Sequence, residues 1–362
     1  MNKNYYAIIM AGGIGSRFWP ISRTSYPKQF LDILGTGKTL IQNTYERLLK
    51  ICPKENIYIV TNENYAGLVQ EQLPGIAQGQ ILTEPVMRNT APCIAYGCYK
   101  IESLNPDASI VVAPSDHLIL DEPAFITAIE KSLKVASEKE CLITLGIMPS
   151  RPDTGYGYIQ YTDDTINDEF HKVKTFTEKP NLELAKTFLQ SGDFLWNAGI
   201  FVWSAKAITK AFYMHQPEMN EIFAEARSVY NTPGERDHIN SAYLQCTNIS
   251  IDYGIMEKAT NVYVLPSEFG WSDLGTWASV YQVAEKDEVY HNVAIPSEKV
   301  LLYNSENCMV NVPPGKLVVI NGLKDFIVVE SNNTLLICPR DEEQSVKQIV
   351  GEVKAKFGNK YI

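Results

Sequence analysis

Short apolar runs alternate with helix-like stretches through the first half of the chain. Three of the runs are rich in Ile, Val and Ala and are typical of buried strands: residues 5–10, 56–60 and 109–113. Apolar positions follow a helical period in three stretches: from Thr39 onward, over residues 91–104 and over residues 122–139. This alternation predicts an α/β fold, a Rossmann-like sheet wound with helices on both faces. Ligands of such sheets bind outside the carboxyl ends of the strands.

The second half of the chain has a different pattern of apolar and polar positions. Residues 141–204 are richer in strand-like segments, which we expect to extend the sheet with antiparallel strands and so make it mixed. After about residue 285, short apolar segments recur with Asn, Gly and Pro between them, as in a small all-β unit. A final helix is expected after Asp341, with an apolar side formed by Val346, Ile349, Val350 and Val353. We therefore predict two domains, residues 1–285 and 286–362.

The composition is that of an ordinary globular protein in water. The chain has 362 residues, of which 45% are hydrophobic and 20% charged. No apolar run approaches the ~20 residues of a membrane-spanning helix, and the N-terminal run leads into glycines without a cleavage site. The seven cysteines have neither zinc-site nor disulfide-framework spacing. We therefore expect a cytoplasmic protein with reduced cysteines and no membrane partner.

The charge is distributed unevenly. The formal net charge is −10, yet the first 31 residues contain no acidic residue and carry four cations: Lys3, Arg17, Arg23 and Lys28. These cations flank a turn that follows the first predicted strand and contains Gly12, Gly13 and Gly15. A backbone without Cβ atoms can approach a phosphate closely. The pattern predicts a small anionic ligand, while the acidic balance and the absence of a basic stripe argue against nucleic acid.

Two other glycine patterns can be excluded as the basis of this prediction. A dinucleotide fingerprint that starts at Gly13 would need a glycine where the chain has Phe18. A P-loop that ends in Gly37-Lys38-Thr39 would need a glycine where the chain has Asp32. The turn at residues 12–15 therefore stays the phosphate candidate.

Several segments, in order along the chain, resemble the sugar-1-phosphate nucleotidylyltransferases and, among these, the mannose-1-phosphate guanylyltransferases. The first is G-G-x-G-S-R-x-W-P-x-S-R from Gly12, followed by P-K-Q-F from Pro27. The others are residues 84–92, 114–117, 176–180 with 196–199, and 270–275. No single segment is specific, but their joint order is, and the resemblance covers nearly the whole chain.

The resemblance implies that GMP is transferred from GTP to mannose-1-phosphate, with release of pyrophosphate. The sugar phosphate would attack in line, assisted by Mg²⁺ and without a covalent intermediate. Because the attacking oxygen is already ionised at neutral pH, such a site needs positioning and charge neutralisation rather than a general base. The resemblance also implies a C-terminal domain like a left-handed β-helix, which often supports a homodimer.

The same resemblance assigns the expected site residues. Arg17 and Lys28 would contact the nucleotide phosphates and stabilise charge in the transition state. Asp116 and Asp273 would hold one Mg²⁺ ion. Further nucleotide contacts are expected from Gly12, Gly13, Gly15, Glu84, Arg88 and Asn89. The sugar phosphate is expected at Gly157, Glu178, Lys179 and Asn197, with Asp252 as an additional candidate.

Two alternatives are weighed against this interpretation. The chain could be a nucleotidylyltransferase for another hexose phosphate or another nucleoside triphosphate. It could also be a non-catalytic regulatory subunit that binds GDP-mannose, although the joint presence of Arg17, Lys28, Asp116 and Asp273 argues against that role. Which residue reads the guanine base stays open at this point.

Overall fold

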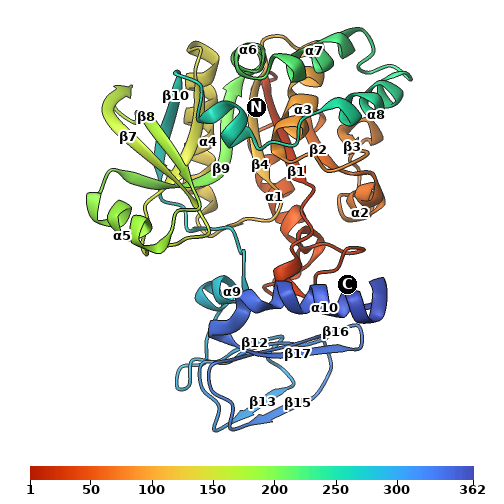
Figure 1. The fold of residues 1–362 in the computed structure, drawn as a ribbon, viewed down its shortest axis with the longest axis vertical. Helices are drawn as coiled ribbons and strands as arrows, with labels where there is room; N and C mark the ends of the chain where they lie inside the picture. Colours follow the sequence, from red (N-terminus) through yellow and green to blue (C-terminus); the bar gives the residue numbers. More distant parts are fainter. The chain divides into compact units, whose positions relative to one another are not determined.

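The structure is a computed structural model of residues 1–362, and its contacts divide the chain into two compact units (Figure 1). The first unit comprises residues 1–12, 44–115 and 119–271. The second comprises residues 13–43, 116–118 and 272–362. The segment that follows the first strand therefore folds with the C-terminal part of the chain. The domain division between residues 285 and 286 stays a prediction.

A nine-stranded mixed sheet forms the first unit, in the order β3-β2-β1-β4-β9-β6-β10-β8-β7. Strands β2 and β4 run parallel to β1, and β9 runs antiparallel between β4 and β6. The mixed α/β sheet predicted from the alternating runs is thus confirmed. The strand bounds are β1 Tyr5–Ala11, β2 Ile57–Asn62, β3 Ile81–Glu84, β4 Ser109–Pro114, β6 Leu142–Ile147, β7 Gly157–Ile166, β8 Phe170–Glu178, β9 Phe194–Ser204 and β10 Val262–Ser267.

Helices pack on this sheet where the sequence shows a helical period. One core cluster joins α3, α6 and α7 to side chains of β1, β4 and β9, including the buried Tyr99, Trp203 and Phe212. None of the helices of the chain combines the length and apolar character that crossing a membrane requires. The helix bounds are α1 Leu40–Leu48, α2 Ala66–Gln72, α3 Thr90–Leu104, α4 Glu122–Glu138, α5 Leu182–Ser191, α6 Ala205–His215, α7 Pro217–Glu225, α8 Glu235–Gln245, α9 Trp277–Val283 and α10 Val346–Phe357.

Two small parallel sheets form the body of the second unit, as expected for a β-helix. In one sheet β12, β14 and β16 run parallel and β17 closes the edge antiparallel to β16, while β13 and β15 form the other. A core of Cys308, Val310, Val312, Ile320 and Val328 is buried in this unit. The bounds are β12 Val293–Ile295, β13 Val300–Tyr303, β14 Met309–Asn311, β15 Val318–Asn321, β16 Phe326–Ser331 and β17 Thr334–Pro339, and the short strands β5 Leu118–Ile119 and β11 Trp271–Ser272 pair with each other.

The N-terminal segment 13–43 belongs to the second unit because its apolar side chains are buried there. Phe18 and Ile33 share a core with Trp277, Met309 and Ile327. The Phe18 and Trp277 rings meet edge to face with their centroids 5.0 Å apart. These contacts join residues hundreds of positions apart, so no local periodicity could have predicted them. The final helix was predicted correctly. Val346 of α10 is buried, and the partly buried Ile349, Val350 and Val353 pack against the same cluster.

Candidate active site

The glycine turn is shaped around the side chain of Lys28. Gly15 has φ 67°, in the left-handed region, and precedes a single turn of 3-10 helix, Ser16–Phe18. A Cβ atom at Gly15 would lie 2.4 Å from the Cβ of Lys28, a contact that side chains do not make. Lys28 itself begins a second short helix, Lys28–Phe30, directly after Pro27. Only glycine at position 15 therefore allows Lys28 to pass beneath the turn.

The Lys28 ammonium is buried and joins three segments of the chain. Its Nζ donates to Asp116 Oδ2 at 3.0 Å and to the main-chain oxygen of Asp273 at 2.6 Å. It also lies 5.6 Å from the centroid of the Phe18 ring, a cation–π contact. Burial alone would raise the pKa of Asp116, but the charges of Lys28 and His117 outweigh it and the net pKa is lowered. Asp116 is therefore an ionised carboxylate at neutral pH.

A cavity of about 350 Å³ opens above this ion pair. Its lining brings together five of the predicted site residues, Gly15, Arg17, Lys28, Asp116 and Asp273. The other lining residues are Ser16, Phe18, His117, Gly275 and Lys347. The cavity thus combines cations, carboxylates and a glycine turn, which is the mixture of charge that a metal–polyphosphate complex needs. Sequence reasoning missed Lys347, because it lies far along the chain in α10.

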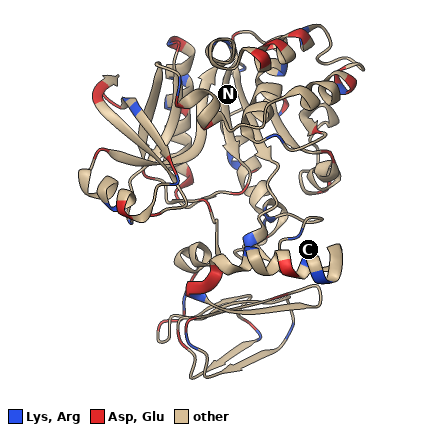
Figure 2. Cartoon of the chain, in the orientation of Figure 1, with Lys and Arg blue, Asp and Glu red and all other residues tan.

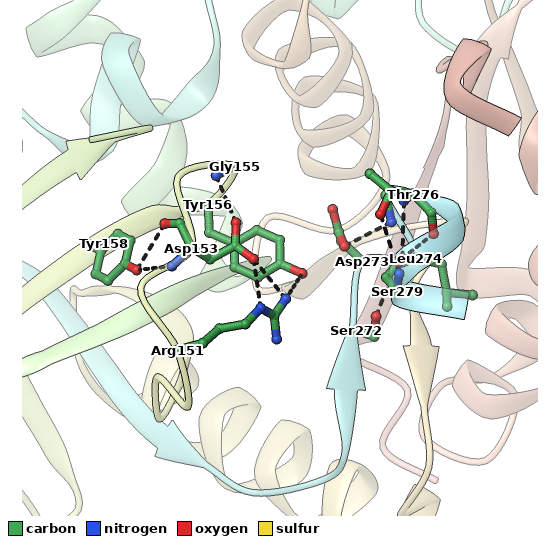
Figure 3. A network of polar contacts seen from close by, with 11 residues as sticks. Arg151, Asp153, Gly155, Tyr156, Tyr158, Ser272, Asp273, Leu274, Thr276 and Ser279 are labelled. Atoms are coloured by element: carbon green, nitrogen blue, oxygen red, sulfur yellow. Dashed lines mark hydrogen bonds and ion pairs between the residues drawn. The ribbon is translucent and has the colours of Figure 1, made fainter. Parts of the chain in front are cut away.

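Asp273 lies in a tight turn before α9. Its Oδ1 accepts a hydrogen bond from the Gly275 N–H at 2.9 Å (Figure 3). Leu274 takes a positive φ of 43°, and its N–H donates to Ser272 Oγ. The Thr276 side chain then caps the first turn of α9. The turn therefore holds the Asp273 carboxylate in place at the start of α9.

Glu84 and Gly12 lie together at the carboxyl edge of the sheet in the first unit. A Cβ atom at Gly12 would be 3.6 Å from Glu84 Oε2. Burial raises the pKa of Glu84 to about 7, and the nearby Tyr243 hydroxyl lowers it only in part. Neither Glu84 Oε1 nor the Tyr243 hydroxyl has a partner at hydrogen-bonding geometry, although both are buried. A buried carboxyl with an unpartnered oxygen is a candidate for recognising a ligand N–H.

The other predicted nucleotide residues have structural contacts of their own. Arg88 Nε donates to the Tyr243 carbonyl at 3.2 Å. Asn89 has φ 68° and caps α3 by accepting from the Thr90 N–H. At Gly13 a Cβ atom would meet nothing within 4 Å, so packing does not explain this glycine.

The four predicted sugar residues gather on neighbouring strands of the first unit. Gly157 pairs with Glu178 across β7 and β8, and a Cβ at Gly157 would lie 2.5 Å from Glu178 Oε2. The same Cβ would lie 3.5 Å from the Cβ of Asn197. Lys179, with φ 48°, forms an ion pair with Glu178. Glycine at position 157 therefore lets the Glu178 carboxylate lie directly against the backbone of β7.

The side-chain amide of Asn197 is held in one orientation. Its Oδ1 accepts from the Gly199 N–H at 3.1 Å and from Thr144 Oγ1 at 3.2 Å. Its Nδ2 donates to Asp252 Oδ1 at 2.7 Å, which leaves a second N–H for a ligand. Asp252 begins a short π-helix, Asp252–Met256, an irregularity often found at functional sites. Burial and the charge of Glu178 raise the pKa of Asp252 to about 6.

Arg151 was not predicted from the sequence, although it lies near these residues in the fold. Its guanidinium donates to Asp153 Oδ2 through Nε at 3.1 Å and Nη2 at 2.7 Å (Figure 3). It also lies over the ring of Trp196, 5.1 Å from the centroid, and Trp196 directly precedes Asn197. This loop therefore places an Arg151–Asp153 ion pair beside the predicted sugar residues.

A mixed α/β sheet with a glycine turn after its first strand and a charged cavity beside that turn is the arrangement expected of a nucleotidyltransferase. The chain belongs to the nucleotidyl transferase family, whose profile matches residues 6–289. A second profile, the MannoseP isomerase/GMP-like beta-helix domain, matches residues 297–353. The resemblance stated from the motifs is thereby confirmed.

Curated relatives and solved structures agree with this assignment. The chain is 36% identical to a mannose-1-phosphate guanylyltransferase of Salmonella montevideo, over 98% of this chain and 75% of the relative. It is 36% identical to the alginate biosynthesis protein AlgA of Pseudomonas aeruginosa, over 96% and 72%. A crystal structure from Thermus thermophilus, described as a mannose-1-phosphate geranyltransferase, superposes with a TM-score of 0.86 at 30% identity and covers 97% of this chain and 99% of that one.

The raised pKa of Asp252 gives a testable pH dependence. An aspartate ordinarily titrates near 3.8, and in the folded chain this one titrates at about 6. Folding therefore favours the protonated form, and its stabilising contribution, present below pH 4, is lost as the pH rises through 6. Asp252→Asn stays neutral, so the Tm of the variant relative to the native chain should rise between pH 4 and 7. The measurement is thermal unfolding across that range, with the exposed Asp163→Asn as the matched control. A difference that does not change with pH would show that Asp252 is not perturbed.

Proposed function

We propose that the chain transfers GMP from GTP to mannose-1-phosphate, giving GDP-mannose and pyrophosphate. The observation that carries the proposal is the cavity lined by Arg17, Lys28, Asp116 and Asp273. The likeness to mannose-1-phosphate guanylyltransferases over nearly the whole chain supports the choice of substrates. We place the reaction in the cytoplasm, where nucleoside triphosphates are available.

Arg17 and Lys28 would neutralise the phosphates as the bond to pyrophosphate breaks. Arg17 is exposed beside the glycine turn, so its planar fork can reach two phosphate oxygens of the leaving group. Lys28 would leave Asp116 in part to contact the α-phosphate, where charge develops in the transition state. The glycine turn would contribute its N–H groups to the same phosphates. The attacking sugar phosphate is already ionised, so no side chain has to remove a proton.

The two carboxylates fit a magnesium ion that enters with the nucleotide. Asp116 and Asp273 line the same cavity, and no cluster of three or more His, Cys, Asp or Glu side chains is present to hold a metal alone. Mg²⁺ prefers one or two carboxylates together with phosphate oxygens and water. When bound, the ion would supply further neutralisation of the phosphate charge.

The sugar and the base would be recognised in the first unit. Glu178 would accept hydrogen bonds from sugar hydroxyls, Asn197 would donate its remaining N–H, and Lys179 would contact the sugar phosphate. Glu84 is the candidate for the base, because its partnerless buried oxygen can accept from the N1–H or the amino group of guanine. Gly12 would let the base approach this carboxylate.

A substrate panel tests the proposed function. The purified chain should form GDP-mannose from GTP and mannose-1-phosphate, reversibly, and should lose turnover in excess chelator. Lys28→Met should lower kcat by about a hundredfold or more, since it removes a preorganised charge contact. The exposed Lys50→Met, which disrupts only a surface ion pair with Glu122, is the control.

The panel also separates the alternatives. Equal turnover with ATP, UTP or another hexose phosphate would contradict the proposed substrates. The chain would then be a nucleotidylyltransferase of another specificity. Binding of GDP-mannose without turnover under any condition would assign a regulatory role instead. Full activity in chelator would contradict the proposed role of Asp116 and Asp273.

We further propose that the chain forms a homodimer through its C-terminal β-helix. Strands β13 and β15 pair in register, and their outward side chains are apolar except for Asn321. Leu301, Tyr303 and Val319 are 45%, 53% and 57% exposed, and Leu317 next to them is 65% exposed. An exposed apolar face on short strands with unpaired edges is a suitable interface for a second copy of the chain.

Charged substitutions on this face should prevent association. The double variant Leu301→Lys, Val319→Lys should be a monomer in light scattering at concentrations where the native chain is a dimer, because two buried ammonium groups would oppose docking. Leu244→Lys, at an apolar residue of α8 that is 72% exposed, should leave the dimer intact. A native chain that is monomeric throughout the tested concentrations would contradict the proposal.

A further inference from the structure

A lysine of the C-terminal helix lines the phosphate cavity. Lys347 lies in the first turn of α10, yet it shares the cavity with Gly15, Arg17 and Lys28. Its side chain is exposed and forms no ion pair within the chain. Figure 2 shows α10 with both blue and red segments. The position of this charge therefore needs an explanation outside the packing of the helix.

Both ends of α10 are fixed to the segment that carries the glycine turn. Next to Lys347, Val346 is fully buried in a cluster with Trp19, Leu336 and Cys338. Beyond the end of the helix, the Trp19 indole Nε1 donates to the Tyr361 carbonyl at 2.6 Å. Trp19 follows Arg17 and Phe18 directly, so α10 is held against the turn. The packing of Val346 consequently sets where Lys347 can reach.

The residues just before α10 are fixed in the same unit. Glu343 Oε2 accepts a hydrogen bond from the Ala278 N–H at 2.7 Å, at the start of α9. Glu343 is also close enough to Arg17 for the guanidinium charge to act on its carboxylate. The chain that enters α10 therefore passes beside Arg17, and Lys347 follows it.

Lys347 lies at the end of α10 where the helix dipole does not favour a cation. The first turn of α10 itself contains no acidic residue, and the nearest ones, Asp341, Glu342 and Glu343, lie in the 3-10 helix Arg340–Ser345 that runs directly into it. The Ser345 side chain does not cap the helix. A residue that goes against the local preferences of a helix, and gains no packing contact by doing so, often has a function. A bound polyphosphate would pair with the ammonium.

The charges that line the cavity also favour an anionic ligand. The Lys28 ammonium is compensated by Asp116. Arg17 and Lys347 are the remaining cations that line the cavity, and both are exposed. They suit the part of the nucleotide with the highest negative charge, the β- and γ-phosphates.

We infer that Lys347 binds the phosphates that leave as pyrophosphate, so that the β-helix domain contributes a substrate-binding residue to the active site. The inference rests on the proposed function, and it deepens it by giving the C-terminal domain a role besides association. Lys347 would act with Arg17 on the leaving group, while Lys28 acts on the α-phosphate.

Kinetics with the full chain test this role. Lys347→Met should raise the KM for GTP, and for pyrophosphate in the reverse reaction, by about tenfold, the effect of one charge-assisted contact. The KM for mannose-1-phosphate should change less than twofold, and Lys347→Arg should recover most of the loss. Lys354→Met, an exposed lysine in the last turn of the same helix, is the control.

A binding measurement separates this inference from the proposed function. Calorimetric titration with magnesium pyrophosphate should show weaker binding and a smaller salt dependence for Lys347→Met than for Lys354→Met, whichever sugar phosphate and nucleotide the enzyme uses. Tm should be unchanged or slightly raised, because a cation is removed from a helix N-terminus. Equal pyrophosphate binding and equal KM values in the two variants would overturn the role of Lys347. If the native chain binds pyrophosphate through Lys347 but makes no GDP-mannose, the inference stands and the proposed function falls.

Discussion

The burial of one ammonium group, that of Lys28, constrains the whole charged cavity. The residue is 4% exposed, and a cation so far from water is stable only among oxygens that replace its hydration. Asp116 and the Asp273 carbonyl provide these oxygens from positions 88 and 245 residues further along the chain. The same side chain requires glycine at position 15, because any Cβ there would strike it. One buried charge thus fixes the turn and both acidic segments.

The carboxyl groups of the candidate sites are tuned in opposite directions by their surroundings. In the charged cavity, Lys28 and His117 lower the pKa of Asp116 despite its burial, so this group is a carboxylate that can pair with cations. In the other unit, burial raises the pKa of Glu84 to about 7 and that of Asp252 to about 6. Groups close to neutrality suit uncharged N–H and O–H partners, such as those of a base or a sugar. The chemistry proposed for each part follows from this difference.

Local sequence patterns predicted the helices and strands well, but they could not predict contacts between segments that lie far apart in the chain. The strand at residues 5–10 and the apolar side of α10 were predicted from periodicity alone, and both agree with the structure. The four N-terminal cations were interpreted together as a ligand signal, but Arg23 donates instead to the Pro20 and Ser331 carbonyls and to Thr334 Oγ1. Lys347 is the opposite case, a cavity residue that the sequence did not predict. Its place in the cavity depends on where Val346 packs, which no sequence spacing encodes.

The central claim is that this chain performs a single in-line displacement by charge neutralisation, without a protein nucleophile. The stereochemical course at the α-phosphorus tests it most directly. One diastereomer of GTP with sulfur on the α-phosphorus would be converted with mannose-1-phosphate, and the configuration of the thio-substituted GDP-mannose determined by phosphorus NMR. A single displacement predicts inversion of configuration. Retention would require two displacements through a guanylylated side chain, and would contradict the account.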